Sequence, residues 1–265
     1  MLIFEAKYNR TEHVMMLVDY GARVRPRDPQ VLDFGIAKHN RQIIQYAVRA
    51  GGNPNKAAEF AMKKNYPEVI EECMQQGSFD ATKVTTWAVQ NGQQQLVRDG
   101  LAMGKMSPAV ILKEGIVHNK GEFCVLGLDA GAQPNLYFDL ACEKGNISTV
   151  GLLLERGADA NKGMEAAIKA NHTAVVVKLL ESGATATNPT FMKTAAGKGN
   201  MEIVTTLLNF GADPNHGLQA SIDGNAPTIA VMLLEKGADA SSPALIGSAA
   251  GKNQTQVVEL LLARG

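Results

Sequence analysis

Residues 201–215 read MEIVTTLLNFGADPN, a run whose apolar residues recur at helical spacing and end at a glycine. Ile203, Val204, Leu207 and Leu208 are three and four positions apart, which places them on one side of an α-helix. Similar segments recur elsewhere in the chain: LLLERGADAN at 152–161, KLLESGATAT at 178–187 and LLEKGADAS at 233–241. Recurrence at a nearly constant period indicates a repeat architecture.

The glycine that ends each apolar helix can be followed through the whole chain at a spacing of 26 to 30 residues. The series is Gly21, Gly51, Gly77, Gly104, Gly131, Gly157, Gly183, Gly211, Gly237 and Gly265. Twelve residues before each glycine stands a second marker: Asn9, His39, Asn65, Gly92, Asn119, Gly145, Asn171, Gly199, Asn225 and Asn253. Nine of these ten are Gly or Asn, the residues that most readily end a helix in the left-handed conformation. The two series predict ten units in one register.

Each unit is predicted to be a hairpin of two helices joined at the second marker, with an apolar flank that only a neighbouring unit covers. Equivalent apolar quartets occur in the front half, at Ile43, Ile44, Ala47 and Val48 and at Val69, Ile70, Cys73 and Met74. The sequence therefore predicts an all-α solenoid of about ten helix hairpins. We expect a single repeat domain over 1–265, with degenerate units in 1–135 and regular units in 136–265.

Segments 201–215 and 147–161 resemble the second helix and Gly-Ala-Asp turn of ankyrin repeats, and the resemblance is clearest over 136–265. The units are shorter than the family's usual length of about 33 residues. Because the missing residues fall in the loop that forms a β-hairpin finger in that family, we expect fingers that are short or absent. The Thr-Pro-Leu-His signature is also missing, so the family's threonine–histidine hydrogen bonds are not expected here.

Composition and motifs argue against several functional classes. Lys plus Arg and Asp plus Glu both number 26, so no overall charge draws the chain to nucleic acid or a membrane. The three cysteines are far apart, the five histidines form no ligand pair, and no phosphate-binding or nucleophile motif occurs. We therefore expect no enzyme activity, no cofactor and no metal, in a cytoplasmic protein, with a nuclear location as the alternative.

Lysines are concentrated in the two positions before each left-handed marker, which hold eight of the 17 in the chain. They are Lys7, Lys38, Lys63, Lys64, Lys144, Lys169, Lys198 and Lys252. Cations at a helix C-terminus complement the helix dipole, which is one explanation of this row. The resemblance implies another, because first helices line the concave surface of ankyrin repeat stacks, where the lysines would face a partner.

Two further features are candidates for binding. The first four units have an aromatic residue five positions before the marker: Phe4, Phe34, Phe60 and Trp87. These rings either pack between successive helices or form an exposed patch, since aromatic residues are enriched in binding hot spots. The loop at 21–30 contains Arg23, Arg25 and Arg27, which are either solvated or contact an acidic partner.

Architecture and resemblance together predict a scaffold or adaptor that binds a protein on its concave face. The candidate partner-binding residues are Arg23, Arg25, Arg27, Lys38, Lys63, Lys64, Trp87, His118, Glu143, Lys144, Lys169 and Lys198. An inhibitor or immunity-type subunit that plugs an enzyme cleft is the alternative. A polyanion or nucleic-acid binder is disfavoured because Glu143 and Asp223 interrupt the basic row. The last helix is apolar and lacks a polar cap, which predicts further repeats or a capping partner at that end.

Overall fold

The computed structural model describes residues 1–24, 30–77 and 79–265. These residues form twenty α-helices and one short 3-10 helix, and they contain no β-strand. The α-helices follow one another as ten pairs, each joined by a short turn. The all-α repeat architecture predicted from the sequence is therefore confirmed, and the loops of the described chain form no β-hairpin fingers.

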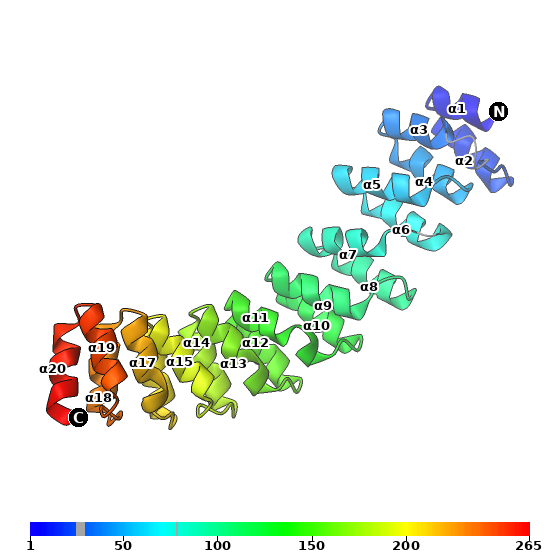
Figure 1. Cartoon of the computed structure of the whole chain (residues 1–265). Coiled ribbons are helices and arrows are strands. Elements are labelled where there is room, and N and C mark those ends of the chain that lie inside the picture. The colour runs from blue at the N-terminus through cyan, green and yellow to red at the C-terminus, as the bar shows by residue number, and fades with distance from the viewer. Residues whose placement is uncertain (25–29, 78) are drawn as a thin grey trace. The chain divides into compact units, whose positions relative to one another are not determined.

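The chain divides into two compact units, Met1–Ala132 and Gln133–Gly265, with five helix pairs each (Figure 1). The pairs of the first unit are α1 (Leu2–Lys7) and α2 (Thr11–Asp19), α3 (Gln30–Ala37) and α4 (Arg41–Arg49), α5 (Pro54–Lys64) and α6 (Pro67–Gln76), α7 (Ala81–Gln90) and α8 (Gln94–Ala102), and α9 (Pro108–Val117) and α10 (Gly121–Asp129). The pairs of the second unit are α11 (Phe138–Lys144) and α12 (Ile147–Glu155), α13 (Ala160–Lys169) and α14 (Thr173–Glu181), α15 (Pro189–Gly197) and α16 (Met201–Asn209), α17 (Asn215–Asp223) and α18 (Pro227–Glu235), and α19 (Pro243–Gly251) and α20 (Thr255–Arg264), preceded by the 3-10 helix Pro134–Tyr137.

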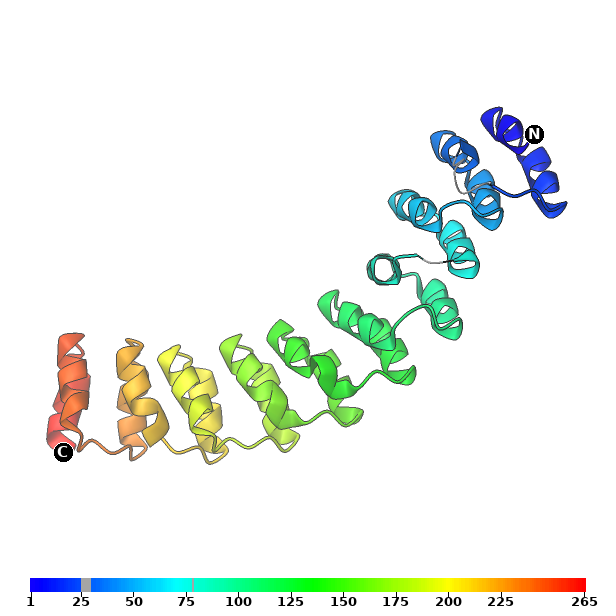
Figure 2. The same cartoon turned by 45° about the vertical axis from the view of Figure 1, so that its right-hand side comes forward.

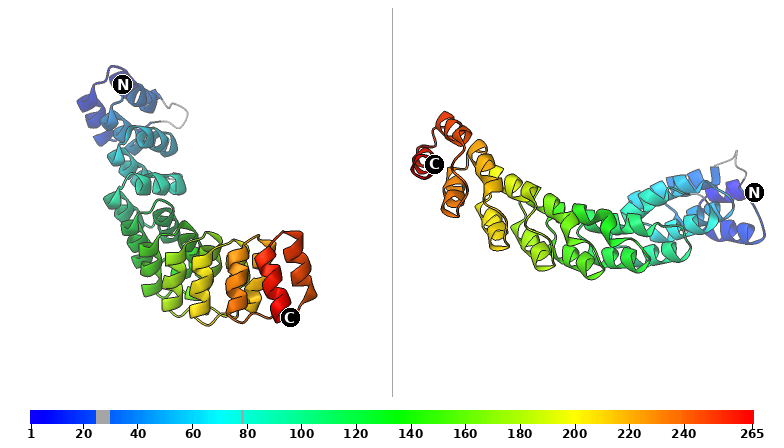
Figure 3. Two further views of the ribbon diagram at one scale, coloured as in Figure 1. Left: turned by 90° about the vertical axis from the view of Figure 1, so that its left-hand side faces the viewer. Right: turned by 60° about the horizontal axis from the view of Figure 1, so that its bottom comes forward.

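Within each unit the pairs stack so that first helices pack on first helices and second helices on second helices. In the second unit α13 packs between α11 and α15, while α14 packs between α12 and α16. Figures 2 and 3 show the loops that connect successive pairs of this unit lying along one edge. The short turns inside each pair consequently lie at the opposite edge, which we call the turn edge.

The turn edge is built on the left-handed markers. All ten marker residues have positive φ, between 53° and 75°, including His39, the one position that is neither Gly nor Asn. Most glycines of the other series are also left-handed, but Gly77 is extended, with φ of 177°. Gly77 differs from the other glycines because α6 continues to Gln76 and makes the glycine its C-cap, whereas α16 ends two residues before Gly211.

The core consists of apolar columns on the second helices, packed against both small and large apolar residues of the first helices, such as Ala57, Leu32 and Phe138. The quartets at 43–48, 69–74 and 175–180 are no more than 4% exposed. In the reference segment Ile203, Val204 and Leu207 are buried, but Leu208 is only half-buried, so its expected burial is corrected. In α20, the last of the described helices, the corresponding Leu262 is 65% exposed.

Two sets of polar contacts between neighbouring pairs reinforce the stacking. At the connecting loops, asparagine side chains accept the backbone N–H of the next loop: Asn55 from Asp80, Asn135 from Asp159, Asn161 from Thr185 and Asn215 from Asp239, at 2.7 to 2.9 Å. At the turn edge, the residue after one marker donates to the preceding marker: Asn40 to Asn9, Asn200 to Asn171 and Gln254 to Asn225. The α13–α14 and α15–α16 pairs are thus bonded to each other at both edges, and so are the α17–α18 and α19–α20 pairs.

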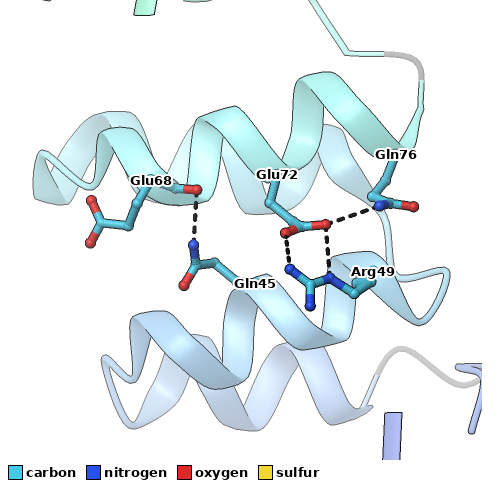
Figure 4. A network of polar contacts seen from close by, with 5 residues as sticks. All are labelled: Gln45, Arg49, Glu68, Glu72 and Gln76. Atoms are coloured by element: carbon cyan, nitrogen blue, oxygen red, sulfur yellow. Dashed lines mark hydrogen bonds and ion pairs between the residues drawn. The ribbon is translucent and has the colours of Figure 1, made fainter. Parts of the chain in front are cut away.

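A charged contact joins the second helices α4 and α6 (Figure 4). Glu72 is only 5% exposed and receives Arg49 Nη2 at 2.7 Å and Arg49 Nε at 3.3 Å. Gln76 donates to the same carboxylate at 3.0 Å. The hydrogen bonds from Arg49 to the Glu72 carboxylate raise the pKa of the Arg49 guanidinium. Because Glu72 is buried, its pairing with Arg49 fixes how α4 and α6 lie against each other.

Within the described residues, no helix combines the length and the apolarity required to span a lipid bilayer.

Candidate interaction surface

The lysines before the markers are exposed, but they have different surroundings in the two units. In the second unit Lys198 Nζ donates to the backbone carbonyl of Lys169 at 2.8 Å, across neighbouring first helices. Lys169 itself pairs with Glu165 at 2.5 Å, one turn earlier in α13. These two lysines therefore have partners within the chain, and Lys198 donates to a carbonyl at the end of α13.

In the first unit Lys38, Lys63 and Lys64 form no ion pair with any residue that the structure describes. The nearby carboxylates on first helices are paired with other lysines. Asp33 contacts Lys56 at 2.5 Å, and Glu59 contacts Lys83 at 3.6 Å. The unpaired lysines lie at the turn edge, where α3 and α5 end.

The four predicted aromatic positions also differ in their surroundings. Phe34, Phe60 and Trp87 are half-buried and pack against the core, whereas Phe4 is 50% exposed. The Phe60 ring lies 5.6 Å from His39 and 6.3 Å from Tyr66. Phe4 stacks 4.7 Å from Tyr8, and the Arg10 guanidinium lies within 6 Å of both rings. Aromatic and cationic groups are thus interleaved along the turn edge of the first unit.

A shallow groove of about 390 Å³ opens on the same edge, between the turns of the first two pairs. It is lined by Asn9, Lys38, His39, Asn40, Arg41 and Gln42. Arg41 is paired with Glu68 at 3.0 Å, while Asn40 donates to Asn9 and Thr11 across the floor. Lys38 therefore supplies the groove with a cation that no described carboxylate neutralises.

The remaining candidate residues are dispersed. His118 lies 3.4 Å from Glu114 and 3.1 Å from Gln90, so it joins α7 and α9. Glu143 lines an open groove of about 530 Å³ between α11 and α13, together with two other acids and two lysines. Lys144, the next residue in the chain, is exposed. Arg23 is exposed, while Arg25 and Arg27 lie outside the described residues.

One contact between neighbouring helix pairs was not predicted from the sequence, and its acceptor is a backbone carbonyl. His172 Nε2 lies 2.9 Å from the carbonyl oxygen of Glu143, and its ring packs over Gly145. A side chain at that glycine would come within 2.6 Å of the imidazole. The position of His172 directly after a marker, equivalent to Asn40 and Asn200, is the signal that could have identified this contact.

The three cysteines, the side chains that could act as nucleophiles, pack in the core. Cys73, Cys124 and Cys142 are fully buried, and burial raises the pKa of Cys73 and of Cys142 to about 12. Thiols in this state are poor nucleophiles at neutral pH. In the described part of the chain, His, Cys, Asp and Glu form no cluster suited to a metal ion.

Comparison with known proteins identifies the fold. No protein-family model matches the sequence, and no curated protein matches it. Among solved structures, the crystal structure of the human ASB11 ankyrin repeat domain is similar, with a TM-score of 0.52 and 22% sequence identity. The similarity covers 58% of this chain and 83% of the ASB11 domain. The chain therefore has the ankyrin repeat fold, in a form with short units and no fingers in the described loops.

Proposed function

We propose that this chain is a protein-interaction scaffold whose binding face is formed by the first helices and the turn edge. The ankyrin repeat fold is typically a non-enzymatic interaction module, and repeat stacks present an extended surface to their partners.

One observation carries the assignment to this face. The buried columns of the second helices repeat from pair to pair, whereas the position directly before the marker changes in charge, size and polarity. Along the chain it is Tyr8, Lys38, Lys64, Asn91, His118, Lys144, Ala170, Lys198, Gly224 and Lys252, all exposed or half-buried. Uniform columns serve packing, and a variable exposed row provides the differences that specific recognition requires.

The test is affinity capture with surface variants. A Lys63→Glu, Lys64→Glu variant changes the turn edge of the first unit by four charges. An Arg98→Glu, Lys236→Glu variant changes the net charge equally at exposed positions on or next to second helices. We expect the first variant to lose proteins that the parent captures, and the second to retain them, with both keeping the parent's helical circular dichroism. Loss confined to the second variant would assign binding to the second-helix surface instead.

A further inference from the structure

The turn edge of the first unit carries lysines that come from the ends of successive first helices. Lys7, Lys38 and Lys63 with Lys64 come from the ends of α1, α3 and α5, so each of the first three helix pairs contributes at least one. Lys38, Lys63 and Lys64 have no ion-pair partner among the described residues, and Lys7 Nζ lies 5.9 Å from the Tyr8 ring. We call these four lysines the basic edge.

The basic edge is continuous across the three pairs. Asn40 donates to Asn9 at 2.9 Å, which joins the first turn to the second. The His39 and Phe60 rings lie 5.6 Å apart, which joins the second turn to the third. Since packed helices are separated by about 8 to 10 Å, the cations recur at roughly that interval along the edge.

Apolar surface lies between the cations. Tyr8 is exposed, and the exposed His39 forms one ring cluster with the half-buried Phe60 and Tyr66, next to Lys63 and Lys64 in the chain. A ligand that only supplied negative charge would leave these rings uncovered. The surface is therefore suited to a ligand in which acidic and apolar groups alternate.

We propose that the basic edge binds an acidic, extended segment of a partner protein with a carboxylate at about every third residue. An extended chain in the polyproline II conformation has three residues per turn and rises about 3.1 Å per residue, so every third side chain lies on one side at about 9 Å and matches the interval between helix pairs. The residues between the carboxylates supply the apolar groups that cover Tyr8, His39 and Phe60. This proposal rests on the proposed function and specifies the chemistry of the partner.

The packing of the aromatic rings favours a protein ligand over single-stranded nucleic acid. Nucleic-acid platforms offer free aromatic faces on which bases stack. Here Phe60 packs against the core and contacts two other rings. The unpaired cations are lysines, which act as point charges for single carboxylates, whereas arginine is the side chain suited to bidentate phosphate contacts.

The experiment measures fluorescence anisotropy of labelled peptides with the full chain at low ionic strength. The probe is a Glu-x-x-Glu-x-x-Glu peptide with leucine and serine at the x positions. A peptide of the same composition with its three glutamates adjacent tests the spacing, and an oligothymidylate tests the nucleic-acid alternative. We expect the spaced peptide to bind most tightly, with an affinity that falls as salt rises.

Matched variants locate the binding. The triple variant Lys38→Glu, Lys63→Glu, Lys64→Glu should bind the spaced peptide about tenfold or more weakly, since three attractions become repulsions. The control variant Arg98→Glu, Lys105→Glu, Lys236→Glu makes the same change in net charge at exposed positions off the basic edge. Its affinity for the spaced peptide should stay within about twofold of the parent's. The triple Lys→Gln variant, which avoids placing acids at helix C-termini, should also weaken binding and serves if the Glu variant does not fold.

Three results would overturn the proposal: no binding of the spaced peptide, tighter binding of the oligothymidylate, or equal weakening by the two charge-matched variants. Equal affinity for the spaced and clustered peptides would overturn the predicted spacing and with it the extended ligand. These results leave the proposed function intact where affinity capture still depends on Lys63 and Lys64. If capture depends only on Arg98 and Lys236, the proposed binding face is wrong, whatever the peptide experiment shows.

Discussion

Replacing Arg49 with methionine should destabilise the first unit more than replacing Glu72 with methionine, although both changes remove the same ion pair. Without Arg49 the carboxylate of Glu72, 5% exposed, retains only the Gln76 amide at 3.0 Å. Stranding one member of a fully buried pair costs about 3 to 5 kcal/mol. Because the Arg49 side chain is 42% exposed and water reaches the site, we expect about 2 kcal/mol here.

The reverse change is milder. Without Glu72 the guanidinium of Arg49 remains in partial contact with water and lies 4.8 Å from the Tyr46 ring, while methionine fills the volume of the glutamate. We expect a cost of about 0 to 1 kcal/mol. Since repeat arrays open pair by pair, hydrogen exchange of the α4 and α6 amides is the appropriate assay, with urea unfolding as a global check. A larger loss of protection in Glu72→Met than in Arg49→Met would refute this reasoning.

Three other changes test the packing, the markers and the thiols. Leu207→Ala should lower stability by about 2 to 5 kcal/mol in thermal or urea unfolding, and Leu208→Ala by clearly less because that side chain is half-buried; equal losses would contradict the column assignment. Asn171, with φ of 67°, should tolerate glycine better than valine by at least about 1 to 2 kcal/mol, and equal melting temperatures would argue against strain at the marker. With pKa values of about 12, Cys73 and Cys142 should react with a thiol reagent at pH 8 only after denaturant is added, so rapid labelling of the native protein would show that the thiols are accessible.

The features that repeat in the sequence were the ones that could be predicted. The left-handed conformation of the markers follows from Asn and Gly at fixed spacing, and even His39 adopts it, because the position in the repeat imposes the turn. The buried quartets followed from helical periodicity in the same way. Gly77 departed from the pattern because α6 extends one residue further toward its glycine than α16 does, and a spacing alone does not show where a helix ends.

Contacts between pairs could not be predicted, because they depend on how far apart neighbouring helices lie. Arg49 and Glu72 are 23 residues apart, and each looks like an ordinary exposed charge on its own helix. The same limit applied to the lysine row, whose two explanations were both compatible with the sequence. In the structure Lys198 has a carbonyl partner on the neighbouring helix pair, whereas Lys38, Lys63 and Lys64 have no ionic partner in the described chain.

Site-specific photocrosslinking tests most directly which face of the scaffold meets other proteins. A photoreactive amino acid would replace Lys64 or Lys144 at the turn edge, and Arg98 or Lys236 at exposed positions on or next to second helices, in otherwise unchanged chains. The account predicts that a partner is crosslinked from position 64 or 144 and not from position 98 or 236. Crosslinking from positions 98 and 236 alone would contradict it, because the variable row at the turn edge would then not be the binding face.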